Sequence, residues 1–225
     1  MFLSVKQPIL FILIAAGVFF PFVSEAAENA FFIRPINEDL KQKITGISFP
    51  KSEEKAQISY DDLAYIHVLH YDFNGQIRDG HLICNKKIAP KIAAVFQELY
   101  ENAYPIEKIR LVDEYGGNDS KSMKDNNTSC FNYRKIAGTN KLSNHSFGLA
   151  VDINPLYNPY VKTTRNKTIV FPDNATVYAD RTKTFDHKID QNDLAYRVFT
   201  KHGFIWGGGW INVKDYQHFE FIEKK

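Results

Sequence analysis

Two histidines and one aspartate form the clearest chemical pattern in this sequence. His145 and Asp152 stand seven positions apart in the segment SNHSFGLAVD, and His218 follows much later in the segment DYQHFE. They offer two neutral nitrogens and one carboxylate, a common catalytic zinc set that leaves a fourth coordination position for water. The pattern predicts a site for one metal ion and for metal-assisted hydrolysis.

Asp215 adds a further carboxylate three residues before His218. If Tyr216 and Gln217 form a turn, residues 215 and 218 face the same point. Asp215 would then accept a proton from the attacking water and later pass it to the leaving amine. We therefore predict that Asp215 is the general base.

Asp152 lies within an otherwise apolar segment, where a carboxylate without a partner is costly to bury. A metal ion would supply that partner. The alternative is that Asp152 accepts hydrogen bonds from the backbone or from Arg134.

Arg134 precedes His145 in the chain. A guanidinium near the metal would clamp a substrate carboxylate or stabilise a tetrahedral oxyanion, and the alternative is a structural ion pair with Asp152 or Asp215. Ser129 and Ser143 are candidates for hydrogen bonds to a substrate, or they are plain turn residues.

Apolar periodicity and turn residues predict the elements that must position these side chains. The expected helices are Asn37–Lys43, Ala89–Tyr100 and Asp193–His202. The expected strands are Tyr65–Tyr71, Ile77–Cys84, Ile109–Tyr115, Leu149–Ile153, Phe204–Trp206 and His218–Ile222. The first two strands form a hairpin around Asn74-Gly75, residues 116–128 form a polar surface loop, and residues 158–190 form an irregular insertion. This mixture predicts an α+β fold, with a small antiparallel sheet and packed helices.

Composition and charge narrow the class of protein. The chain has 225 residues, of which 44% are hydrophobic and 14% aromatic, which suits one globular domain over residues 27–225 with a lead-in at 27–60. The net charge is only +2 and no long basic run occurs, which argues against a nucleic-acid partner. We expect a monomer.

Residues 1–26 have the pattern of a secretory signal. Lys6 is followed by an uncharged apolar run, and Ser24 and Ala26 are small residues at the positions that precede a cleavage site. Cleavage after Ala26 predicts an exported protein, periplasmic or extracellular, without a stable membrane span. The alternative is an uncleaved membrane anchor. In an exported protein Cys84 and Cys130 would form one disulfide or remain two separate buried thiols.

The motif Ser143-x-His145-x-x-Gly148-x-Ala150-x-Asp152-Ile153, followed by Asp215-x-x-His218-Phe219, resembles the signature of the M15 metallopeptidases. These are D-alanyl-D-alanine carboxypeptidases and dipeptidases and L-alanyl-D-glutamate endopeptidases that act on peptidoglycan. Residues 152–160, 128–134 and 103–108 resemble the subgroup that contains phage-type endolysins. The resemblance covers roughly residues 77–221.

The resemblance implies one zinc ion on His145, Asp152 and His218. It implies Asp215 as general base, where many relatives carry glutamate. It also implies that Arg134 lies near the substrate and that Trp210 lines the cleft.

The implied fold is the small α+β domain shared with the zinc-containing signalling domain of hedgehog proteins. The implied substrate is a peptidoglycan stem peptide, cleaved either as a D-Ala-D-Ala carboxypeptidase or as an L-Ala-D-Glu endopeptidase. Because a zinc site on this fold need not be catalytic, a zinc-stabilised wall-binding or signalling module is the alternative.

Overall fold

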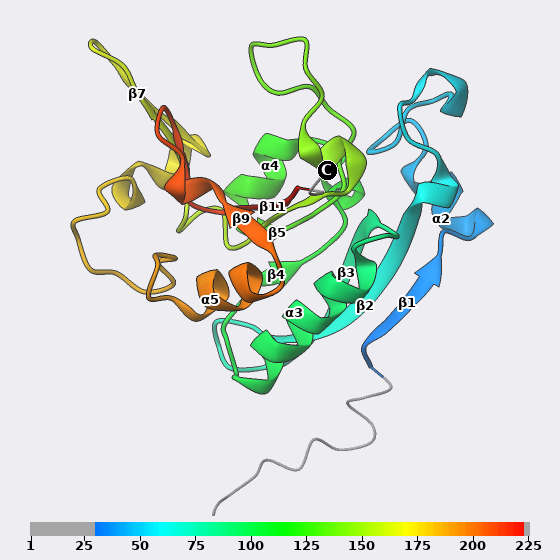
Figure 1. Cartoon of the computed structure of the whole chain (residues 1–225), viewed down its shortest axis with the longest axis horizontal. Coiled ribbons are helices and arrows are strands. Elements are labelled where there is room, and N and C mark those ends of the chain that lie inside the picture. The colour runs from blue at the N-terminus through cyan, green and yellow to red at the C-terminus, as the bar shows by residue number, and fades with distance from the viewer. Residues whose placement is uncertain (1–29, 223–225) are drawn as a thin grey trace, which may run out of the picture.

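The computed structural model describes residues 30–222 of the chain, so the predicted signal segment lies outside the described residues. The fold is α+β, as predicted (Figure 1). The helices are α2 Glu38–Ile44, α3 Ala89–Glu101, α4 Asp119–Lys124 and α5 Leu194–Lys201. The strands are β1 Phe32–Pro35, β2 Leu63–Tyr71, β3 Ile77–Asn85, β4 Lys108–Ile109, β5 Asn127–Thr128, β6 Ala150–Asp152, β7 Tyr160–Thr163, β8 Thr168–Phe171, β9 Phe204–Trp206, β10 Lys214–Asp215 and β11 His218–Phe221. Among residues 30–222, no helix has the length and apolar character needed to cross a membrane.

The sheet formed by β1, β2 and β3 confirms the predicted hairpin. β2 and β3 pair antiparallel from Leu63 opposite Asn85 to Tyr71 opposite Ile77. Gly75 in the connecting turn has a φ of 72°, a conformation that glycine adopts without steric cost. Helix α3 packs on this sheet and buries its apolar stripe of Ile92, Val95, Phe96 and Leu99.

A second sheet, the site sheet, has the order β6-β11-β9 and carries two of the predicted metal ligands, Asp152 on β6 and His218 on β11. Its central strand β11 places Phe219 against Phe199 of α5, with ring centroids 4.2 Å apart. Phe199 in turn contacts Phe96 of α3. One apolar core therefore connects the first sheet, the two helices and the site sheet.

Local capping sets the ends of the predicted helices. The Asn37 side chain accepts a hydrogen bond from the backbone N–H of Leu40 at the start of α2, and Asp193 does the same for Ala195 at the start of α5. Gly203, with a φ of 91°, follows α5. These contacts satisfy backbone donors that a helix leaves unpaired at its first turn.

The prediction of a strand over Ile109–Tyr115 was mostly wrong. Only Lys108–Ile109 forms a strand, and Val112–Tyr115 forms a 3-10 turn that ends at Gly116. The turn is stabilised because the buried Asp113 carboxylate accepts a hydrogen bond from the backbone N–H of Ser48, a contact between distant segments that the local sequence does not reveal.

Two segments predicted to be irregular contain regular structure. The 116–128 loop holds α4, capped by the Asn118 side chain, and β5, which pairs parallel with β4. The 158–190 insertion holds a hairpin of β7 and β8 and a 3-10 turn at Asp173–Tyr178. The predicted antiparallel sheet is thus several small sheets rather than one.

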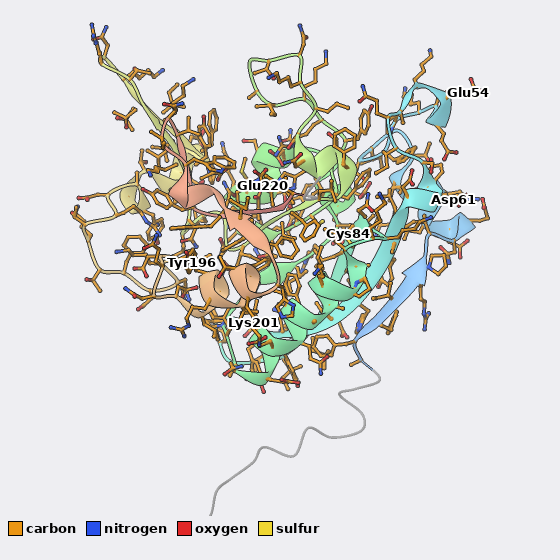
Figure 2. All side chains as sticks on the ribbon, in the orientation of Figure 1. Glu54, Asp61, Cys84, Tyr196, Lys201 and Glu220 are labelled. Carbon is orange, nitrogen blue, oxygen red and sulfur yellow. The ribbon has the colours of Figure 1, made fainter. Side chains whose placement is uncertain are left out.

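The two cysteines are free buried thiols, the second of the two alternatives. Burial raises the pKa of both thiols above the ordinary value. Cys84, labelled in Figure 2, is fully buried in the apolar core that α3 forms with the β2–β3 sheet.

Candidate metal centre

His145 is presented by a 3-10 turn, Asn144–Phe147. The Ser143 side chain caps the turn by accepting a hydrogen bond from the His145 backbone N–H, at 3.3 Å. The turn ends at Gly148, whose φ is 62° and where an added Cβ would lie 2.4 Å from the backbone nitrogen of Asn85. Only glycine fits this backbone, which explains the glycine three residues after the histidine in the motif.

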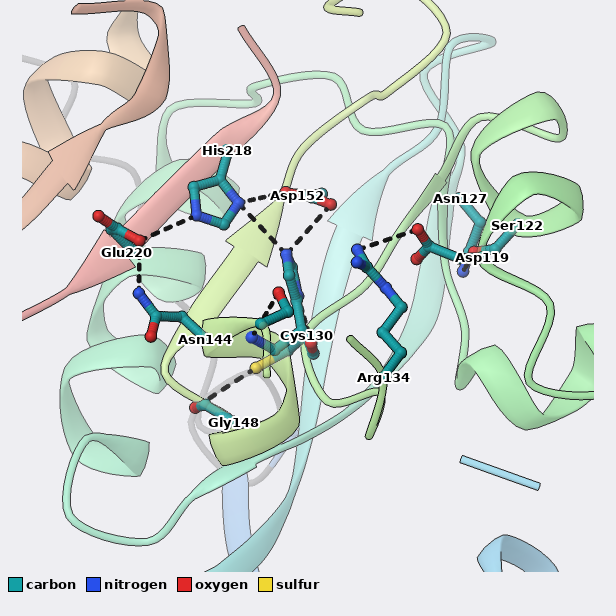
Figure 3. A network of polar contacts seen from close by, with 12 residues as sticks. Asp119, Ser122, Asn127, Cys130, Arg134, Asn144, Gly148, Asp152, His218 and Glu220 are labelled. Atoms are coloured by element: carbon teal, nitrogen blue, oxygen red, sulfur yellow. Dashed lines mark hydrogen bonds and ion pairs between the residues drawn. The ribbon is translucent and has the colours of Figure 1, made fainter. Parts of the chain in front are cut away.

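Asp152 and His218 meet because their strands are neighbours. β6 pairs antiparallel with β11, and the register places His218 directly opposite Asp152. Both side chains are buried and both point toward His145 (Figure 3). The two distant sequence motifs therefore form one cluster.

The three side chains fit one small cation. His145 Nε2 lies 3.2 Å from His218 Nδ1 and 3.3 Å from Asp152 Oδ2, and His218 Nδ1 lies 3.0 Å from Asp152 Oδ1. A tetrahedral centre with bonds of about 2.0–2.1 Å separates its ligand atoms by about 3.3–3.4 Å. In residues 30–222 this is the one group of histidine, cysteine or acidic side chains whose ligand atoms converge in this way.

Further contacts orient the two imidazole rings. His145 Nδ1 lies 2.6 Å from the carbonyl oxygen of Cys130, so Nδ1 carries the proton and Nε2 presents its lone pair. His218 Nε2 lies 3.3 Å from Glu220 Oε2, so Nδ1 faces the cluster. Such contacts fix ring orientation and raise ligand basicity. Glu220 was missed from the sequence, although its place two residues after His218 on a strand puts both side chains on one face.

The opposite charges of Asp152 and His218 favour the ionised form of each of these two side chains. Burial by itself would raise the pKa of Asp152, but His145 and His218 outweigh it and hold that pKa far below its usual range. Burial by itself would lower the pKa of His218, but hydrogen bonds to Asp152 and Glu220 outweigh it and raise the pKa of His218 to about 10. Because a metal binds the neutral imidazole, binding of a cation at this cluster must release the proton that the raised pKa of His218 favours.

Asp215 reaches the same place from strand β10. It pairs with Tyr160 of β7, and its Oδ1 is buried without a hydrogen-bond partner among residues 30–222. Burial, with the negative charge of Asp152 nearby, raises the pKa of Asp215 to about 6 although His218 opposes the shift. A carboxylate that has one buried oxygen without a partner and a raised pKa suits a proton acceptor.

Gly207 allows Asp215 this close approach. A Cβ on Gly207 would lie 2.8 Å from the carbonyl oxygen of Asp215, 3.0 Å from its Cβ and 3.3 Å from the Cβ of His218. The absence of a side chain at Gly207 therefore lets the backbone of Asp215 pack closely beside His218.

The cluster lies in a cleft of about 600 Å³. Two segments that project from the same side of the molecule supply its walls, the 135–142 loop and the β7–β8 hairpin (Figure 1). The loop contributes Ile136, Ala137 and Leu142, and the hairpin contributes Tyr160, Lys162, Ile169 and Phe171.

Arg134 and Trp210, which were predicted to lie near the substrate, both line the cleft. Arg134 lines the cleft, but its ion pair is with Asp119 of α4, at 2.9 Å, and not with Asp152 or Asp215 (Figure 3). Trp210 lines the cleft with its ring centroid 5.3 Å from that of His218.

Ser143 also lines the cleft, and its side chain caps the 3-10 turn that carries His145. Ser129 is buried and bridges the backbone of Asp152 through both its N–H and its carbonyl, so its backbone positions a cluster residue. Its role as a substrate contact stays a prediction.

Comparison with known proteins agrees with this geometry. Residues 137–221 match the family model described as D-alanyl-D-alanine carboxypeptidase, a range that includes the whole cluster and Asp215. No curated protein and no solved structure matches the chain. Residues 137–221 are therefore similar to the metal-dependent M15 peptidases, and the cluster within this range offers the ligands for a metal.

Proposed function

We propose that this protein is an exported zinc-dependent peptidase that hydrolyses a bond in the stem peptide of peptidoglycan. The observation that carries the proposal is the position of Asp215 in the same cleft as the three ligand side chains, with its Oδ1 buried and without a hydrogen-bond partner among residues 30–222. A site that only held a structural metal would not need this group.

Zinc suits the donor set of two imidazole nitrogens and one carboxylate. When bound, the ion would polarise the scissile carbonyl and lower the pKa of water. His145 and His218 would hold it through Nε2 and Nδ1, the two nitrogens that face one another, and Asp152 would hold it through its carboxylate.

The chain's own residues supply the other steps. Asp215 takes the proton from the attacking water and delivers it to the leaving amine. Arg134 offers a guanidinium in the cleft, with an Nε atom that has no partner among residues 30–222, and it binds a substrate carboxylate or the developing oxyanion. Lys162 adds a second cation on the opposite wall.

The stem peptide fits these features because it is acidic and extended. Two bonds are candidates, the terminal D-Ala-D-Ala bond and the L-Ala-D-Glu bond. Mass spectrometry of defined muropeptides incubated with the protein distinguishes them. Loss of one alanine from a pentapeptide stem identifies a carboxypeptidase, and release of the stem from L-Ala identifies an endopeptidase. An absence of both products with zinc-loaded protein would contradict the proposal.

The pH profile is expected to show the titration of Asp215. Only the ionised carboxylate accepts a proton, so kcat/KM should fall as pH decreases through the pKa, by about tenfold per pH unit below it. Burial puts that pKa at about 6 in the metal-free chain, and a bound cation stabilises the carboxylate and moves the limb to lower pH. Rates should be measured with zinc content checked at each pH. An increase in kcat/KM from pH 7 to pH 5 would contradict this role.

Gly207→Ala is expected to lower kcat by on the order of 10²-fold, because the new methyl group must displace the backbone of Asp215 from the ligands. Gly209→Ala is the matched control, since no atom lies within 4 Å of its added Cβ. Steady-state kinetics of the two variants test the idea. A wild-type kcat for Gly207→Ala would show that the position of Asp215 is not critical.

Export rests on the signal pattern of residues 1–26. The intact mass of the protein recovered from its native host tests it, because cleavage after Ala26 leaves a chain that begins at residue 27.

A further inference from the structure

Glu220 holds one ligand histidine and joins the two halves of the metal motif. Its Oε2 accepts a hydrogen bond from His218 Nε2, at 3.3 Å, and another from Asn144 Nδ2, at 2.5 Å. The Glu220 side chain is only 13% exposed. Figure 3 shows this chain of contacts beside the cluster.

The contact follows from the fold. His218 and Glu220 are two residues apart on β11, so their side chains project from the same face. Asn144 immediately precedes His145 in the 3-10 turn. The Asn144–Glu220 hydrogen bond therefore connects the neighbours of both ligand histidines without any metal.

We propose that Glu220 is a positioning residue of the metal centre, which with Asn144 sets the orientation and the basicity of His218. The carboxylate accepts a hydrogen bond from Nε2–H and so increases electron density at Nδ1, the atom that faces the cluster. It also adds a second negative charge to that of Asp152, so that the two carboxylates together balance a divalent cation. The inference rests on the metal centre of the proposed function and does not depend on which bond is cleaved.

Three variants distinguish the effect of Glu220 on the orientation of the His218 ring from the effect of its negative charge. Glu220→Ala removes both contacts, Glu220→Gln keeps an acceptor oxygen and removes the charge, and Asn144→Ala removes only the link to the other motif half. Glu54→Gln is the control for loss of one negative charge, because Glu54 is exposed and its label in Figure 2 lies far from that of Glu220.

The readout is the zinc dissociation constant, measured by competition with a chromophoric chelator, together with the visible absorption spectrum of the Co²⁺-loaded protein. We expect Glu220→Ala to weaken zinc binding about 10- to 100-fold, Glu220→Gln and Asn144→Ala to weaken it less, and Glu54→Gln to leave it unchanged. The Co²⁺ spectrum should shift in both Glu220 variants and not in Glu54→Gln.

Zinc affinity within about twofold of wild type in Glu220→Ala, with an unchanged Co²⁺ spectrum, would overturn the inference. If Glu220→Ala does not fold, the same criteria applied to Glu220→Gln decide, with circular dichroism of the metal-free protein as the check of folding. A wild-type protein that binds zinc but cleaves no muropeptide would contradict the proposed function, while the affinity ratios would still test Glu220.

Discussion

Asp215→Asn is expected to remove most of the turnover, by about 10²- to 10⁴-fold, while one metal ion stays bound. The amide has nearly the shape of the carboxylate but accepts no proton. Asp215 is not among the three converging ligands, and its Oδ1 has no partner among the described residues, so the substitution should leave the cluster intact.

The measurement is kcat on a defined muropeptide together with zinc content by mass spectrometry of the same sample. Asp61→Asn is a suitable control because Asp61 is exposed. If zinc-loaded Asp215→Asn retained substantial hydrolysis, Asp215 would not be the base.

His145→Ala is expected to abolish both metal retention and activity. The substitution removes one of three converging ligand atoms and leaves the Cys130 carbonyl without the donor that it now receives from Nδ1. Zinc per chain after gel filtration should fall from about one to near zero.

His202→Ala is the matched control, since His202 follows α5 and contacts Glu98 rather than the cluster. Zinc still bound at one equivalent to His145→Ala would remove His145 from the ligand set.

The three residues of the cluster could be predicted from the sequence because few side-chain types can bind a metal ion. A carboxylate in an apolar strand needs a partner, and Asp152 has it in His145 and His218. The pairing of β6 with β11, which brings Asp152 opposite His218, was not visible, because strands more than sixty residues apart carry no local signal of their register.

The missed features share a physical cause. Helix α4 is short and polar, and its one cue was the capping side chain of Asn118. Strand β7 of the β7–β8 hairpin pairs with β10, which lies about fifty residues later in the chain. The regular structure of the hairpin therefore depends on a distant segment and is not encoded in the hairpin sequence alone. The ion-pair partner of Arg134 was expected to be Asp152 or Asp215. The actual partner, Asp119, lies on α4, a helix that was not predicted.

The shape of the cleft could not be predicted from the sequence, because its walls are the β7–β8 hairpin and the 135–142 loop. Asp152 and His218 come from the site sheet, which is packed on α5, and His145 comes from the 3-10 turn before β6. The walls come from segments with few buried side chains. The geometry of the cluster is therefore fixed by the core, and the exposed segments that form the cleft walls are free to differ in shape and charge.

The most direct test of the account is a zinc titration of chelator-stripped protein while product release from muropeptides is followed. We expect no turnover without metal, a linear rise in activity, and a plateau at about one zinc per chain, as one cluster of three ligands requires. Full turnover by the stripped protein would contradict metal-assisted hydrolysis. Binding of one zinc without any turnover would contradict the peptidase and favour a zinc-stabilised binding module.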